Sequence, residues 1–123
     1  MQIKKEDTKK HYAPKAELIL VEGITEHVIE KINELTLALE KEGGKAGVIA
    51  TDETMALYKT GEVLSLGARA DEMALAKHLY RILREFDARG VDRIYSENFK
   101  TEGIGQAVAD RLQKAAGNQI IHV

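Results

Sequence analysis

Four residues that follow two short apolar runs carry the types of group that could contact a ligand. Thr51 and Asp52 come directly after the first run, and Gly67 and Arg69 come after the second. A hydroxyl beside a carboxylate could form a catalytic pair, and an arginine near the start of a helix could bind an anion. Thr51 or Asp52 could instead cap a short helix, and Arg69 could simply be solvated. The helix cap and the solvated arginine are the more common roles, and both alternatives stay open.

The stretch GIGQAV, which begins at Gly103, is similar to a glycine-rich phosphate fingerprint at the start of a helix. Gly103 and Gly105 occupy its first two glycine positions, but Val108 stands where the third small residue belongs. The stretch also lies late in the chain, and no acidic residue follows about 20 positions on at a strand end, as a dinucleotide site expects. A turn that lets the helix pack closely on a sheet is the favoured interpretation, and nucleotide binding is the alternative.

Other patterns typical of active sites are missing from the sequence. Neither Ser65 nor Ser96 lies in the G-x-S-x-G elbow of a hydrolase nucleophile. The histidines have no metal-ligand spacing, so we predict no metal site. We expect His27 and His78 on helix surfaces. His11 should lie on the N-terminal arm and His122 in the last strand. The folded body is therefore predicted to be noncatalytic.

Apolar runs that alternate with segments of helical periodicity must position these residues. The runs predict five strands: Glu17–Val21, Ala46–Ala50, Glu62–Leu66, Val91–Glu97 and Gln119–Val123. Strands separated by helices pair in parallel through crossovers, which place helices on both faces of a sheet. We therefore predict a three-layer, Rossmann-like α/β domain with five mainly parallel strands, and we expect the strand order 3-2-1-4-5.

The predicted helices are bounded by capping residues and glycines. Thr25 should cap a helix that ends at Gly43, and Thr51 or Asp52 should cap a short one. A long helix over Ala70–Ala88 carries one apolar stripe and should end at Gly90 in a left-handed conformation. Its stripe consists of Leu75, Leu79, Ile82, Leu83 and Phe86. The last helix should run from Ile104 to Ala115.

Composition limits the class of protein. The chain has 123 residues, 44% of them hydrophobic, which fits one domain with its own core. It has no cysteine, which favours an intracellular origin, and we expect a cytoplasmic protein. No apolar stretch approaches the roughly 20 residues of a membrane helix, so we expect no membrane partner.

The charge is distributed unevenly around a net value of -2. Residues 1–15 carry five lysines against Glu6 and Asp7, whereas the rest of the chain is acidic. Proteins that bind nucleic acid concentrate positive charge on the folded body, and aromatic residues make up only 5% of this chain. We therefore expect no direct contact with nucleic acid.

The N-terminal segment, residues 1–16, is predicted to be an extended arm, with the folded domain over residues 17–123. Pro14 fixes its own backbone and favours an extended Ala13, so HYAP should be stiff. We expect residues 1–12 to make few contacts with the body and order to begin near Lys15.

Several stretches together resemble the C-terminal accessory domain of the longer form of threonylcarbamoyl-AMP synthase. They begin with HYAPKAEL at His11 and include GVIATDET at Gly47 and SLGARAD at Ser65. The longest are LREFDARGVDRIYSE at Leu83 and EGIGQAVADRLQKAAG at Glu102. The resemblance covers essentially residues 11–123.

The resemblance implies a role beside an enzyme. That family's nucleotidyltransferase makes threonylcarbamoyl-adenylate and pyrophosphate from ATP, threonine and bicarbonate, toward N6-threonylcarbamoyladenosine in transfer RNA. ATP, with magnesium, is implied for the parent enzyme, and no cofactor for this chain. Catalysis belongs to an N-terminal YrdC-like domain that these residues do not contain, so the implied partner is that domain, in cis or in trans. In the family the linker crosses the catalytic cleft, which implies a lid, or only a tether, made of His11, Tyr12, Ala13 and Pro14.

One departure from the family pattern keeps a second hypothesis open. The family places a Pro-Gly pair several residues before HYAP, and MQIKKEDTKK contains neither residue. The chain is therefore either an excised domain with a foreign leader or a stand-alone descendant. The alternative function is a stand-alone α/β module that binds a nucleotide or another phosphate ligand at the strand carboxyl ends.

Overall fold

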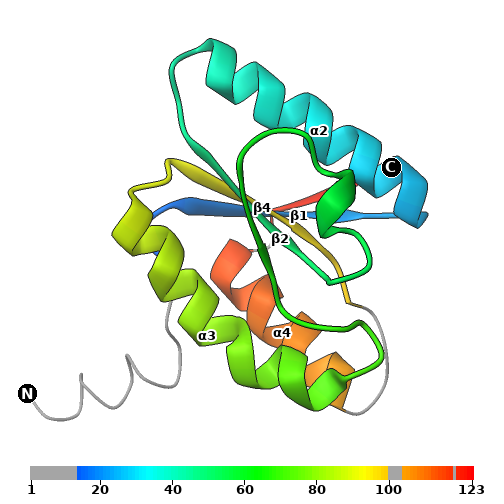
Figure 1. Ribbon diagram of the computed structural model, residues 1–123. Helices are drawn as coiled ribbons and strands as arrows, with labels where there is room; N and C mark the ends of the chain where they lie inside the picture. Colours follow the sequence, from blue (N-terminus) through cyan, green and yellow to red (C-terminus); the bar gives the residue numbers. More distant parts are fainter. Residues whose placement is uncertain (1–13, 100–103, 118) are drawn as a thin grey trace, which may run out of the picture.

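The computed structural model describes residues 14–99, 104–117 and 119–123, which form one parallel sheet between helices (Figure 1). The strands are β1 (Glu17–Glu22), β2 (Ala46–Ala50), β3 (Glu62–Ser65), β4 (Arg93–Glu97) and β5 (Ile120–His122). The helices are α2 (Thr25–Lys41), the short 3-10 helix η1 (Met55–Leu57), α3 (Glu72–Arg89) and α4 (Ile104–Ala116). The predictions for residues 1–13 and for Gly103 lie outside the described residues.

The five strands are all parallel, as expected, but their order is β3-β2-β4-β1-β5. The predicted order, which placed β1 beside β2, is wrong. Arg93 at the start of β4 pairs with Glu17 of β1 on one side and with Ala46 of β2 on the other. β4 is the central strand and is buried on both faces, with Ile94 on one and Tyr95 on the other. The 17-residue helix α2 lets the chain cross over β4 on its way from β1 to β2.

Helices cover the two faces of the sheet in the way that right-handed crossovers require. The chain moves from β1 to β3 in one direction and returns to β5 in the other, so the connecting helices must change face. Figure 1 shows α2 on one face and α3 and α4 on the other. Three layers result, which confirms the predicted architecture.

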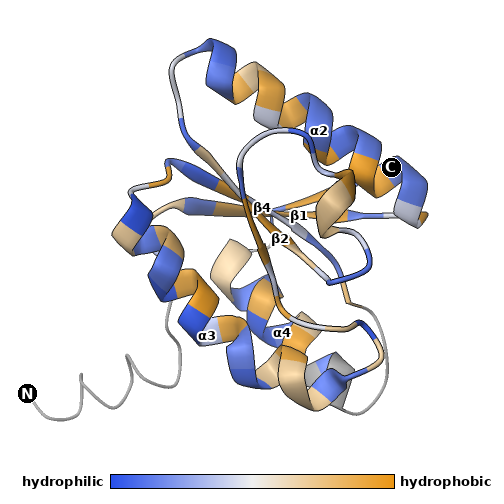
Figure 2. Cartoon of the chain, in the orientation of Figure 1, coloured by the Kyte–Doolittle hydropathy of each residue, from blue (hydrophilic) through white to orange (hydrophobic). Residues whose placement is uncertain are grey.

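Two hydrophobic clusters fill the spaces between the layers. The larger one lies between the sheet and the helices α3 and α4, and the apolar stripe predicted for α3 is buried in it in full. The smaller one lies under α2 and contains Val28, Ile32 and Tyr58. Figure 2 shows hydrophobic residues gathered in the central strands and along stripes of the helices. The three α-helices are thus held by their apolar sides.

The helix ends show where local prediction holds and where it does not. Gly90 ends α3 in the left-handed conformation (φ 70°), as predicted, and Asp71 caps its start by accepting a hydrogen bond from the Ala74 N–H. Thr25 is not a cap, because α2 begins at Thr25 itself and Ile24 precedes it. None of the helices in the described part of the chain is long and apolar enough to cross a membrane.

Candidate functional site

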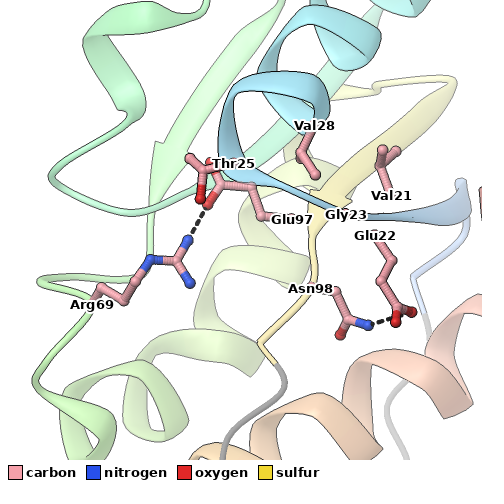
Figure 3. A pocket seen from close by; sticks show the side chains of 8 residues that line it. All are labelled: Val21, Glu22, Gly23, Thr25, Val28, Arg69, Glu97 and Asn98. Atoms are coloured by element: carbon pink, nitrogen blue, oxygen red, sulfur yellow. Dashed lines mark hydrogen bonds and ion pairs between the residues drawn. The ribbon is translucent and has the colours of Figure 1, made fainter. Parts of the chain in front are cut away.

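The strand order creates a crevice between the carboxyl ends of β1 and β4. These strands are neighbours, but the chain leaves β1 toward α2 on one face and β4 toward α4 on the other. Parallel sheets bind ligands at such points, because the diverging connections leave space. A pocket of about 340 Å³ lies here. Its polar lining comes from Glu22, Gly23, Thr25, Arg69, Glu97 and Asn98, and two valines add apolar surface (Figure 3).

Glu97, the last residue of β4, is the buried charge of this site, with 3% of its surface exposed. One carboxylate oxygen accepts hydrogen bonds from the Thr54 hydroxyl and the Tyr58 phenol, both at 2.6 Å. The other oxygen accepts one from Arg69 Nη2. Three donors, one of them charged, therefore compensate a carboxylate that the sheet removes from water.

Tyr58 is held as a hydrogen-bond donor by its surroundings. Burial raises the pKa of its phenol well above the ordinary value, and the neighbouring Glu97 charge and hydrogen bond raise it further. The phenol is thus protonated at any physiological pH. Since Tyr58 follows η1, this bond also fixes the connection between β2 and β3 to the end of β4.

Arg69 reaches the pocket from the loop after β3. Its guanidinium pairs with Glu97 and lies 5.0 Å from the centre of the Phe99 ring, while 41% of the side chain stays exposed. Its backbone N–H donates to Glu53 at 3.0 Å, and this bond is the main cause that lowers the pKa of the Glu53 carboxyl. Arg69 is therefore oriented by its ion pair with Glu97. The sequence had suggested an anion-binding or a solvated arginine, and neither interpretation included this pair.

The opposite side of the pocket carries a second carboxylate. Asn98 Nδ2 donates to Glu22 Oε1 at 3.1 Å, and the Phe99 N–H donates to Asn98 Oδ1 at 2.9 Å. Gly23 follows Glu22 at the turn between β1 and α2, and a Cβ atom there would clash with the Val123 carbonyl oxygen. Only glycine therefore fits this turn. Gly23 and Thr25, at the start of α2, both line the pocket.

The residues singled out from the sequence are only partly brought together. Asp52 and Gly67 are joined by a backbone hydrogen bond of 2.9 Å, and Asp52 Oδ1 accepts a bond from Ser65 Oγ at 2.7 Å. Thr51 is buried against Thr54. Of these positions only Arg69 lines the pocket.

The predicted helix cap at Thr51 or Asp52 is wrong, because Thr54 occupies the cap position of η1 and its side chain makes no capping bond. Asp52 instead connects the ends of β2 and β3. Gly105 lies in the first turn of α4. Within the described residues no group of three or more His, Asp or Glu side chains could hold a metal ion.

None of the three histidines that the structure describes lines the pocket. His27 is exposed on α2, as predicted, whereas His78 is half-buried with Nδ1 3.2 Å from the Leu66 carbonyl oxygen. His122 is exposed, with Nδ1 4.0 Å from the Glu22 carboxylate.

Comparison with known proteins gives one consistent family. The family described as "Threonylcarbamoyl-AMP synthase, C-terminal domain" matches residues 7–117. Among curated proteins, the threonylcarbamoyl-AMP synthase of Pyrococcus abyssi is 43% identical over 114 residues, which cover 93% of this chain and 32% of the relative. That of Bacillus subtilis is 40% identical over 111 residues, covering 90% of this chain and 31% of the relative. The chain spans about a third of the length of these relatives.

Solved structures agree with this match. A crystal structure of P. abyssi Sua5 complexed with L-threonine superposes with a TM-score of 0.80 at 42% identity, over 92% of this chain and 32% of that one. The C-terminal Sua5 domain from Pyrococcus horikoshii superposes with a TM-score of 0.71 at 38% identity, over 90% of this chain and 100% of that one. The second structure consists of this domain alone.

Proposed function

The chain belongs to the family of C-terminal domains of threonylcarbamoyl-AMP synthase, and we propose that it acts as the accessory domain of such a synthase. The carrying observation is the match of residues 7–117 to that domain within relatives three times as long. The proposed reaction joins ATP, threonine and bicarbonate into threonylcarbamoyl-adenylate and pyrophosphate. Its product serves the modification of transfer RNA.

Catalysis is assigned to a YrdC-like domain, in cis or in trans, which also binds ATP and magnesium. The chemistry of the pocket supports this division. Its one arginine is already paired with Glu97, and a second carboxylate, Glu22, lies across from it. Among the described residues this lining offers the phosphates of ATP no unpaired cation, which supports placing ATP on the partner domain.

Pyrophosphate release tests the accessory role. The purified chain, given ATP, threonine and bicarbonate, should release pyrophosphate no faster than a blank without protein. Joined to the catalytic domain, or mixed with it, the chain should raise the rate of that domain or lower its KM. Turnover by the chain alone would contradict the proposal, and so would a catalytic domain whose rate and KM are unchanged by the fusion.

The arm, residues 1–16, is proposed as a lid over the partner's catalytic cleft, with residues 17–123 as the folded domain. The arm joins the body at the amino end of β1, where the Lys15 N–H donates to Asp87 Oδ1 at 3.0 Å and Ala16 is buried. This attachment supports a body that begins close to Lys15, and we propose that the residues before it contact another domain. The lid residues would be His11, Tyr12, Ala13 and Pro14.

Replacing Tyr12 by alanine in the joined enzyme tests the lid. A lid acts by excluding water and holding the intermediate, so Tyr12→Ala should lower adenylate formation or its retention about tenfold or more. The melting temperature of the domain should stay unchanged. Lys9→Ala, in the same arm, is the matched control and should keep full activity. If Tyr12→Ala lowered the melting temperature by several degrees with activity per folded molecule intact, Tyr12 would be a packing residue.

A further inference from the structure

Most of the exposed large hydrophobic side chains in the described part of the chain lie near the carboxyl ends of the strands. Five of the six lie there, and we call them the apolar rim: Ile24 (61% exposed), Met55 (39%), Leu57 (53%), Met73 (69%) and Val123 (41%). We propose that the apolar rim, together with Arg69, is the surface that binds the catalytic domain of the synthase. This inference rests on the proposed accessory function and adds the contact surface to it.

The topology of the sheet brings the rim residues to one end of the molecule. Ile24 follows β1, Met55 and Leu57 belong to η1 after β2, and Val123 follows β5. Met73 lies in the first turn of α3, which comes after β3. Because the strands are all parallel, their carboxyl ends point the same way. Figure 1 shows η1, the starts of α2 and α3 and the C-terminus on the right-hand side of the molecule.

Two rim residues lie beside the pocket between β1 and β4. Ile24 stands between Gly23 and Thr25, which both line the pocket. A Cβ atom at Gly23 would lie 2.9 Å from Cγ2 of Val123, so the Val123 side chain lies against the same turn. The Val123 N–H donates to the Glu22 carbonyl at 2.8 Å, which fixes the end of the chain there. Apolar surface therefore adjoins the polar lining of the pocket.

The rim residues of η1 are held in place by the Glu97 network. Thr54 precedes η1 and Tyr58 follows it, and both donate to Glu97 at 2.6 Å. Asn33 of α2 also donates to the Leu57 carbonyl at 3.1 Å. The backbone of η1 is thus fixed on both sides while its apolar side chains face water. A surface that is ordered before a partner arrives loses less conformational entropy on binding.

Arg69 adds an oriented polar group to this surface. Only Nη2 of its guanidinium has a hydrogen-bond partner among the described residues, and 41% of the side chain is exposed. Its other N–H groups can donate to an acceptor on the partner. Methionine and arginine are enriched in protein interfaces, and arginine often contributes much of the binding energy. An arginine beside exposed Met55 and Met73 matches this composition.

The relatives indicate which partner covers the rim. The chain matches about a third of the synthases of P. abyssi and B. subtilis, so two thirds of each relative lie outside the match in the same polypeptide. Exposed apolar surface on one domain of a larger protein is typical of a contact with another domain. The distance allows this contact, because residues 1–13 can span up to about 45 Å and β1 is only about 20 Å long.

Hydrogen exchange tests the surface in a joined enzyme. The chain is fused to the part of the P. abyssi synthase that lies outside the match. Compared with the 123-residue chain alone, the fusion should slow amide exchange about tenfold or more in residues 23–27, 52–58 and 67–74. Residues 42–45 and 90–92, at the opposite ends of the strands, should exchange equally in both proteins.

Two results of this experiment would overturn the proposal. One is a fusion in which residues 23–27, 52–58 and 67–74 exchange as fast as in the chain alone. The other is protection of these residues in the chain alone that increases with its concentration, because a second copy would then cover the rim.

Variants of exposed residues locate the contact. The double variant Leu57→Ser, Met73→Ser should remove most of the protection in the fusion. Leu37→Ser is the matched control, because Leu37 is 46% exposed but lies in the second half of α2, away from the strand carboxyl ends. It should keep the protection in full. All three side chains face water, so the melting temperature should stay unchanged in both proteins. Equal protection in the double variant and the control would overturn the proposal.

The docking surface and the accessory function can fail separately. If the fusion protects the rim but leaves the rate and the KM of the catalytic domain unchanged, the accessory function fails and the docking surface stands. If the fusion raises the rate equally in the wild type and in the Leu57→Ser, Met73→Ser variant, the accessory function stands and the docking surface is overturned.

Discussion

Charged residues lie at both ends of the parallel strands, which we call the carboxyl edge and the amino edge of the sheet. The two groups differ in how far they are exposed to water. At the carboxyl edge, the Glu97 side chain is 4% exposed and is surrounded by three donors. At the amino edge, Glu17 pairs with Arg93 at 3.0 Å while 44% of its side chain remains in water. The same two residue types thus form a buried network at one edge and a solvated pair at the other.

The amino edge consists of several solvated contacts of this kind. Arg89 pairs with Glu62 at 2.7 Å and with Glu85 at 3.0 Å, all with side chains more than a third exposed. Water screens such pairs, and each contributes little to stability. The pair of Arg89 and Glu62 connects the end of α3 to the start of β3, and at the same edge the Lys15 N–H donates to Asp87 Oδ1.

The difference separates two roles along one sheet. The folded body begins at the amino edge, where the charged pairs described above stay in water. At the carboxyl edge, the buried carboxylate of Glu97 cannot turn to water and therefore fixes the direction of the Arg69 side chain. If this distinction is real, removing a charge at the carboxyl edge must cost much more than removing one at the amino edge.

The largest effect is expected from Glu97→Ala. The substitution leaves the buried phenol of Tyr58 without its acceptor, which costs about 1–3 kcal/mol, and leaves the Thr54 hydroxyl with only its weaker contacts to Thr51. Arg69 is partly exposed and can turn to water, so its share of the loss is smaller. We expect the free energy of unfolding, measured with urea, to fall by about 3 kcal/mol or more.

Glu17→Ala is the matched control at the amino edge and should lower the free energy of unfolding by about 1 kcal/mol or less. Equal losses in the two variants would remove the distinction between the edges.

The sequence predicts the elements of this molecule better than their arrangement. The apolar stripe of α3 and its end at Gly90 follow from local periodicity and backbone preference, and both are confirmed. The strand order does not follow, because a helix as long as α2 can carry the chain to an adjacent position or past one strand with the same local pattern. Nothing in the sequences of β1 and β2 indicates that β4 lies between them.

The site shows the same limit. Glu97 is bonded to residues that lie 43, 39 and 28 positions away in the chain: Thr54, Tyr58 and Arg69. No short motif joins residues at such distances. One signal was available, since a glutamate at the end of a strand predicted to be buried needs partners to compensate its charge.

A smaller effect is expected when the Tyr58 hydroxyl is removed. Tyr58→Phe deletes one of three donors to Glu97 and should cost about 1–2 kcal/mol near neutral pH. It should also change the response to alkali. Because the pKa of Tyr58 is raised in the folded protein, its contribution is complete below the unfolded value of about 10 and is lost as the pH rises above it. Urea unfolding of wild type and Tyr58→Phe between pH 8 and about 11 measures the difference.

Tyr95→Phe is the control for this experiment. Tyr95 is also buried, but its one hydroxyl bond among the described residues is to the half-buried Arg93, at 3.5 Å. Its removal should cost less than that of the Tyr58 hydroxyl. If the wild type and Tyr58→Phe lost stability equally steeply above pH 10, the phenol of Tyr58 would not be held protonated by its burial and by Glu97.

The smallest expected effect is the change of the ion-pair coupling energies with salt, and it distinguishes the two edges most directly. A double-mutant cycle with Glu17→Gln and Arg93→Gln should give a coupling energy of about 0.5 kcal/mol at low salt. At about 1 M sodium chloride the screening length falls to about 3 Å, so this coupling should approach zero because water surrounds both partners. The cycle with Glu97→Gln and Arg69→Gln should keep most of its coupling at the same salt concentration, because Glu97 is shielded from solvent ions. A Glu97–Arg69 coupling that disappeared with salt as fully as that of Glu17 and Arg93 would mean that solvent ions reach both edges alike, and the buried carboxylate could not be what fixes Arg69 toward the pocket.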